Sequence, residues 1–152
     1  METPGVLKEK YDTLAKKYDL PSWNQLDKEF ELMYVPPISE VRHPIAFVAR
    51  RIRDRLSYIL GHLNSVVNPP QNNMLSTREH SFLSQDDHKE VLMLMSTIMA
   101  SLSKPELAVN MSDKGQVEVL KDRIATWKKI KPKYLKIGKK IEHGWKKTVK
   151  GK

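Results

Sequence analysis

The chain has 152 residues, with 27 lysines and arginines against 18 acids, and its formal net charge is +9 at pH 7. It contains no cysteine, which excludes disulfides, cysteine-ligated zinc and thiol catalysis. Hydrophobic residues make up 39%, too many for a disordered chain, and the length suits one domain over residues 1–152 with the last few residues frayed. There is no apolar signal core at the N-terminus and no apolar run near the roughly 20 residues of a membrane helix, so a soluble cytoplasmic protein is expected.

Residues 4–18 form the first predicted helix, because apolar side chains recur there every three or four positions. Leu20 and Pro21 break this helix, and Ser22 is placed to cap a second one whose apolar stripe ends at Met33. Three prolines fall within residues 34–44 and would deny a helix its hydrogen bonds, so this segment is predicted to be a linker.

The clearest core helix is predicted over residues 44–68, with Pro44 in its first turn. Its apolar residues recur at helical spacing and share one face. They are Ile45, Val48, Ile52, Leu56, Ile59, Leu63 and Val66. Asn68 and the two prolines after it end the helix, and residues 69–83 are predicted to be a loop with at most one short turn.

The next helix is predicted over residues 84–104, with Ser84 and Asp87 in capping-box spacing. Its expected inner face consists of Val91, Leu92, Met95, Ile98, Met99 and Leu102. Met93 falls off that stripe. A last helix is capped by Ser112 or Asp113, and Pro132 is expected either to kink it or to open a sixth helix. Together these elements predict an all-α bundle of five to six helices with a long amphipathic C-terminal helix.

Residues 128–152 hold 11 lysines and one acid, Glu142, so they carry the whole positive excess of the chain. At 100° per residue the apolar side chains from Tyr134 onward fall on one face of a helix, and the lysines fall on the other. The apolar set is Tyr134, Ile137, Ile141, Trp145 and Val149, and the lysine set is Lys133, Lys136, Lys139, Lys140, Lys146, Lys147 and Lys150. A helix to about residue 149 is therefore predicted, and Gly138 on its apolar side is expected to let another helix approach.

Such a lysine face has several interpretations. It can simply solvate a packed helix, or it can contact the phosphates of nucleic acid. An anionic membrane surface and an acidic protein are further alternatives. The lysine face contains no arginine, which is the residue suited to reading guanine, and the aromatic residues lie on the opposite face. If nucleic acid is bound, it is expected to be bound through phosphates and without sequence preference.

Arg50, Arg51 and Arg53 form a second basic cluster on the predicted helix over residues 44–68. Ion pairing on the helix surface with Glu and Asp of neighbouring helices is one interpretation of these arginines. The other is a phosphate-contacting patch that extends the lysine face, which makes them candidate nucleic-acid-binding residues together with the seven lysines.

Metal binding and catalysis find little support in the sequence. Histidines and acids crowd one segment, but their spacing matches no ligand motif, and its two aspartates are explained as first-turn acids of a helix. The crowded residues are Glu79, His80, Asp86, Asp87 and His88. No nucleophile, base and acid stand in a catalytic order, so no enzyme, metal, cofactor or small-molecule substrate is predicted. A protein–protein module or homodimer is the alternative function, because Met93 and Trp145 offer apolar surface that one small bundle need not cover.

Three segments resemble a group of small, uncharacterised helical proteins from archaea. They are KKYDLPSWNQLDKEFEL (Lys16–Leu32), FLSQDDHKEVLMLMSTIM (Phe82–Met99) and TWKKIKPKYLKIGKKIEHGW (Thr126–Trp145). The resemblance spans most of the chain and consists of caps, a proline break and apolar stripes. It implies an all-α fold and an intracellular protein, and it brings no activity, ligand or functional residue. The excess of lysine over acid in the last segment departs from the more balanced charge of that group.

Overall fold

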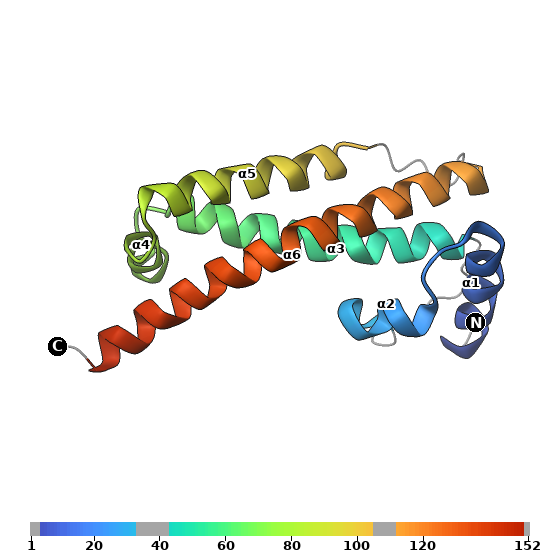
Figure 1. Cartoon of the computed structure of the whole chain (residues 1–152), viewed down its shortest axis with the longest axis horizontal. Helices are drawn as coiled ribbons and strands as arrows, with labels where there is room; N and C mark the ends of the chain where they lie inside the picture. Colours follow the sequence, from blue (N-terminus) through green and yellow to red (C-terminus); the bar gives the residue numbers. More distant parts are fainter. Residues whose placement is uncertain (1–3, 33–42, 105–111, 151–152) are drawn as a thin grey trace. The chain divides into compact units, whose positions relative to one another are not determined.

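The computed structural model describes residues 4–32, 43–104 and 112–150, and within these ranges it contains six α-helices and no strand (Figure 1). The helices are α1 (Pro4–Tyr18), α2 (Trp23–Phe30), α3 (Pro44–Val67), α4 (Met74–Ser81), α5 (Gln85–Leu102) and α6 (Asp113–Lys150). The predicted all-α class and the long C-terminal helix are thus confirmed. Met33, nearly all of the predicted linker over residues 34–44, and residues 105–111 lie outside the described ranges.

Packing divides the chain into two compact units, and the expectation of one domain over residues 1–152 stays a prediction. The first unit comprises residues 1–55 and 104–124, and the second comprises residues 56–103 and 125–152. Helices α3 and α6 each contribute one stretch to the first unit and one to the second. The two units are described separately below.

Aromatic packing forms the core of the first unit. Tyr11 of α1 is fully buried, and its hydroxyl donates a hydrogen bond of 2.8 Å to the carbonyl of Pro21. Its ring meets that of Trp23 edge to face, and Trp23 in turn stacks on Phe47 of α3. Burial raises the pKa of the Tyr11 phenol far above its usual range. These contacts hold α1, α2 and the start of α3 together.

Helix α2 begins and ends as local chemistry requires. The Ser22 hydroxyl accepts from the Gln25 backbone amide, and the Gln25 side chain accepts from the Ser22 backbone amide. This is a complete capping box, and it confirms the prediction that Ser22 caps the helix. The helix ends at Glu31, whose left-handed φ of 52° stops the helical path.

One buried charge of the first unit escaped sequence reasoning. Arg123 of α6 is fully buried, and its Nη1 donates to the carbonyl of Ala49, 3.1 Å away. This bond joins the first-unit stretches of α3 and α6. Leu120 and Ile124 beside Arg123 are also buried, and apolar spacing gives no sign of the arginine between them, because buried arginine is rare and depends on a partner.

In the second unit, α5 starts at Ser84 with the predicted capping box, in which Ser84 and Asp87 satisfy each other's backbone amides. Its buried residues are Val91, Leu94, Ile98 and Ser101. The predicted inner face was therefore wrong at Leu92 and Met99, each of which is 49% exposed. Apolar residues run almost all the way round this helix, so their spacing alone does not determine which face is buried.

The predicted loop over residues 69–83 was wrong in its middle, where the structure contains α4. Asn73 caps this helix through its side-chain oxygen, which accepts from the Ser76 amide at 3.0 Å. The segment shows almost no amphipathic pattern, since Met74 and Leu75 are both exposed. The apolar spacing of this segment therefore does not indicate a helix, whereas Asn73 is of a residue type favoured at helix starts.

Helix α6 continues through Pro132 as one element of 38 residues, so the expected alternative of a separate sixth helix beginning there was wrong. Ser112 caps its start by accepting from the Gly115 amide at 3.2 Å. Proline removes one backbone donor but leaves the helical φ intact, and Ile130 and Ile137 on either side are buried. Val149 was predicted on the buried stripe but is 83% exposed, because the packed part of the helix ends before it.

Replacing Tyr11 by phenylalanine removes the hydroxyl that satisfies the Pro21 carbonyl. We expect Tyr11→Phe to lower the free energy of unfolding by about 1 kcal/mol. Urea denaturation followed by circular dichroism measures this change. Tyr58→Phe is the matched control, because Tyr58 is 72% exposed and should be neutral. Equal effects of the two variants would contradict the role given to the Tyr11 hydroxyl.

Candidate functional site

The candidate site is the outward face of the second-unit part of α6, where most of the predicted lysines are exposed. We call five of them the outer lysine face: Lys136, Lys139, Lys146, Lys147 and Lys150. The buried Ile137 and Ile141 fix the inward side of the helix, so these lysines are directed away from the core by helical geometry. The prediction of a helix with an apolar and a lysine face is thus confirmed.

Two of the seven predicted lysines belong to the packing instead. Lys133 pairs with Glu90 at 3.3 Å, and Lys140 pairs with Asp87. Because the earlier residue of α6 meets the later residue of α5, the two helices run antiparallel here. The side chain of Asp87 is 13% exposed, and the hydrogen bond from Lys140 lowers its pKa below the usual range. Lys140 and Lys133 thus tie α6 to α5.

Lys146 has a partner on its own helix. It lies 2.7 Å from Glu142, one turn earlier, and both side chains are more than 60% exposed. The contact lowers the pKa of Glu142 and raises that of Lys146. Exposed pairs of this kind are weak, so the lysine can exchange this acid for another anion at little cost.

The remaining four lysines of the outer face have no acid within ion-pair distance among the residues that the structure describes. They are Lys136, Lys139, Lys147 and Lys150. Lys128 and Lys129 are exposed on the same helix and were not among the predicted binding residues. Continuing the 100° step backwards through Pro132 places both lysines on the same side as Lys139 and Lys147, so helical periodicity in the sequence is the signal that identifies them.

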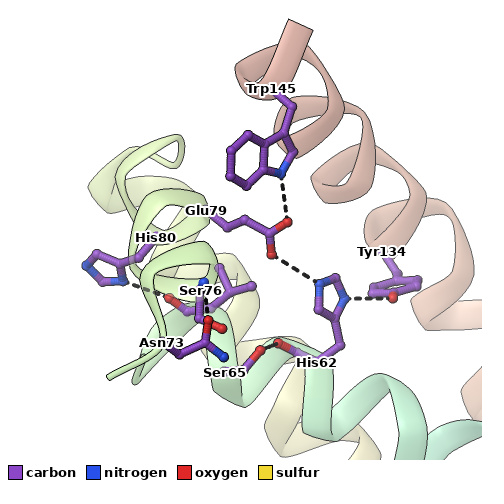
Figure 2. Close-up of polar contacts among 9 residues, drawn as sticks. His62, Ser65, Asn73, Ser76, Glu79, His80, Tyr134 and Trp145 are labelled. Atoms are coloured by element: carbon purple, nitrogen blue, oxygen red, sulfur yellow. Dashed lines mark hydrogen bonds and ion pairs between the residues drawn. The ribbon is translucent and has the colours of Figure 1, made fainter. Parts of the chain in front are cut away.

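A chain of polar contacts holds the inward side of α6, as Figure 2 shows. One oxygen of Glu79, on α4, accepts a hydrogen bond of 2.9 Å from the indole N–H of Trp145. Its other oxygen lies 3.6 Å from Nε2 of His62, on α3. The Nδ1 atom of the same histidine lies 3.0 Å from the Tyr134 hydroxyl. One carboxylate therefore connects α3, α4 and α6.

Partial burial protects the contacts of Glu79. One of its oxygens and Nε2 of His62 lie 3.6 Å apart, which is an ion-pair distance and longer than a hydrogen bond. Glu79 and His62 side chains are 21% and 34% exposed, which keeps these contacts partly shielded from water. Trp145 was predicted as apolar surface for a partner, but it is half-buried and occupied by Glu79.

Close packing surrounds Trp145. Its ring meets Phe82 edge to face, with centroids 5.1 Å apart. Phe82 also lies directly over Gly144, where an added Cβ would fall 2.3 Å from the ring. Gly138 was expected to permit such an approach, but it is exposed and has nothing within 4 Å of a Cβ position. The close approach to α6 takes place at Gly144, which lies on a different side of the helix from Gly138.

The three candidate arginines lie in the first unit, and only Arg50 is exposed. Arg51 is half-buried. Arg53 lies 3.3 Å from Asp54, the next residue of its own helix. This arginine cluster therefore offers less free charge than the lysines of the outer face.

The crowded histidines and acids do not assemble into a metal site within the described residues, where no group of three or more ligand-type side chains is found. His80 and His88 stack with ring centroids 4.2 Å apart. Nδ1 of His80 faces the Val66 carbonyl at 2.7 Å, and Nε2 of His88 faces the His80 carbonyl at 3.2 Å. Asp87 is engaged by Ser84 and Lys140, as described above.

Comparison of the chain with protein-family models, curated proteins and solved structures found no match. The resemblance to small helical archaeal proteins therefore rests on the three sequence segments alone. Among the helices that the structure describes, none has the length and apolar character required to cross a membrane.

The two glycines of this part of α6 make a matched pair. We expect Gly138→Ala to raise the free energy of unfolding by about 0.5–1 kcal/mol, because alanine is the better helix former and open space surrounds it. We expect Gly144→Ala to lower it by about 1–3 kcal/mol, because the new methyl group would overlap the Phe82 ring. Chemical denaturation of both variants checks the signs, and stabilisation by both would show that Phe82 does not lie on this helix.

Stability should also depend on acidic pH through Asp87. Its pKa is lowered in the folded state, so its contribution is complete above its unfolded value of about 3.9 and is lost as pH falls through the folded value. Lys140→Gln removes the ammonium but keeps the capping box. We expect this variant to lose less stability than the wild type between about pH 5 and pH 2, measured by urea titration. Lys136→Gln is the control and should retain the wild-type slope.

Proposed function

We propose that the protein is a non-catalytic binding protein whose outer lysine face contacts the phosphates of nucleic acid without reading its sequence. The observation that carries the proposal is the exposure of Lys136, Lys139, Lys147 and Lys150 on one helix, with no acid paired to them among the described residues. Two other lysines of the helix do find acids on α5. None of the four forms an ion pair within the described residues, although Lys139 is near enough to Glu142 to lower the pKa of that carboxyl.

Double-stranded nucleic acid suits this face better than a single strand. Proteins that hold single strands stack bases on exposed aromatic rings. On this part of α6, Tyr134 and Trp145 are held inward by His62 and Glu79, and Trp127 is half-buried with Lys131 over its ring. The outside carries ammonium groups one or two helical turns of about 5.4 Å apart, with Glu142 in the gap between Lys139 and Lys146. Such groups can contact a backbone of dense charge but offer no base contact.

The absence of arginine from the outer face argues in the same direction. Lysine presents a mobile point charge, whereas arginine presents a planar fork that fits guanine edges or a single phosphate. A face made of lysine alone tolerates small shifts along the backbone. It therefore supports sequence-tolerant binding and a complex with rapid exchange.

The test is fluorescence anisotropy with labelled duplex and single-stranded oligomers of equal length, titrated at several salt concentrations. Three to six phosphate contacts predict a slope of roughly −3 to −5 for log affinity against log salt on the duplex. The duplex should bind more tightly than the single strand. Replacing Lys136, Lys139, Lys147 and Lys150 together by glutamine should flatten the slope by up to about 4.

A charge-matched control separates this face from net charge. Lys16, Lys28, Lys114 and Lys121 are exposed in the first unit, and glutamine at all four positions removes the same total charge. This control variant should keep most of the wild-type slope. No binding at low salt, or equal losses in the two quadruple variants, would refute the proposed interface.

A further inference from the structure

From residue 91 onward, the outward side of α5 carries no charge. Residues 91–103 contain no charged side chain, although the chain carries a net charge of +9. Only four of these residues are buried in the helix, at Val91, Leu94, Ile98 and Ser101. The helix is therefore more apolar than its own packing requires.

The exposed residues gather on the opposite side of the helix. Leu92 and Met99 are each 49% exposed, and Met93 is 62% exposed. Ser96 and Ala100 are exposed between them. We call these five residues the α5 face. Exposed apolar residues arranged contiguously on one helix are typical of an interaction surface, whereas scattered ones need no explanation.

The α5 face is complementary to itself about Ser96. At 100° per residue, Leu92 and Met99 lie on one side of Ser96, while Met93 and Ala100 lie on the other. A two-fold axis across the helix at Ser96 pairs it with an antiparallel copy. Leu92 then meets Met99 of the second copy, and Met93 meets its Ala100. The large side chain at Met93 thus faces a small one, and the two serines face each other at the axis.

Charge selects the antiparallel arrangement over the parallel one. Lys89, one turn before the face, is exposed. In a parallel pair it would lie beside Lys89 of the second copy, and like charges that close repel. In the antiparallel pair it lies opposite the uncharged Ser103, and the two helix dipoles oppose each other favourably.

Charge also favours a second copy over an acidic partner as the occupant. An acidic protein would be drawn to the lysines of α6, because the α5 face has no cation to attract it. A copy of the α5 face requires no charge to be desolvated.

We propose that the α5 face forms a reversible, antiparallel homodimer contact, with Ser96 on its two-fold axis. About three helical turns are covered, so the contact falls in the small class of weak, transient interfaces, and a Kd on the order of 0.1 mM is expected. The contact is independent of the lysine face. Raising the salt concentration screens repulsion between the two positive chains and should strengthen the dimer, whereas it weakens phosphate binding.

Sedimentation equilibrium from about 0.02 to 1 mM protein at two salt concentrations tests the proposal. The wild type should shift from monomer toward dimer, and more strongly at high salt. Met93→Glu should weaken the dimer at least tenfold, while Met74→Glu should leave it unchanged, because Met74 is an even more exposed methionine that lies on α4, outside the α5 face. A monomer throughout the range, or equal effects of the two substitutions, would overturn the proposal.

The chain has no cysteine, so single-cysteine variants give a direct measure of the geometry. Ser96→Cys should oxidise to a covalent dimer, because residues on the axis approach within the roughly 4.4–6.8 Å between Cα atoms that a disulfide needs. Ser57→Cys, at an exposed serine of α3, is the matched control and should oxidise much more slowly. Equal oxidation rates would show that Ser96 is not at the contact. Nucleic-acid binding by the Met93→Glu variant should be unaltered, so failure of either proposal leaves the other standing.

Discussion

The packing of the second unit depends on the contacts that the Glu79 carboxylate makes with two other helices. This carboxylate is the only group shown in Figure 2 that reaches both His62 of α3 and Trp145 of α6, and it does so from α4. Such a carboxylate is useful structurally because its two oxygens accept from different directions. Glu79 lies on α4, a helix of eight residues, and a helix holds a side chain in position more firmly than a loop does.

The position of α6 follows from contacts on two sides of its inward face. The polar chain and the Phe82 ring hold one side through Tyr134, Gly144 and Trp145. The ion pairs of Lys133 and Lys140 with α5 hold the other. The rotation of the helix about its own axis is therefore fixed, and with it the direction in which the outer lysine face points. The charge pattern and the packing pattern of the helix are thus two results of one arrangement.

The sequence was sufficient to predict the elements whose chemistry is local or periodic. Caps at Ser22, Ser84 and Ser112, and the sorting of lysines from isoleucines on α6, were all predictable. Failures occurred where partners distant in the chain decide. The buried face of α5 could not be chosen because apolar residues surround that helix, and Gly144 could be distinguished from Gly138 only by the position of Phe82. The division of the lysines into paired and unpaired ones depends likewise on where Asp87 and Glu90 lie.

Each positive charge on the outer lysine face belongs to a lysine ammonium group, and such a group can be neutralised by chemical modification. Acetylation neutralises a lysine, whereas methylation of an arginine keeps its positive charge. The charge of this face can therefore be lowered in single steps, without any change in the fold, at the four lysines that have no acid partner among the described residues. Each step would remove about 0.9 from the salt slope of a duplex complex. Acetylation of Lys140 would instead remove its ion pair with the largely buried Asp87. The same modification would therefore change surface charge at some lysines of the helix and lower stability at another.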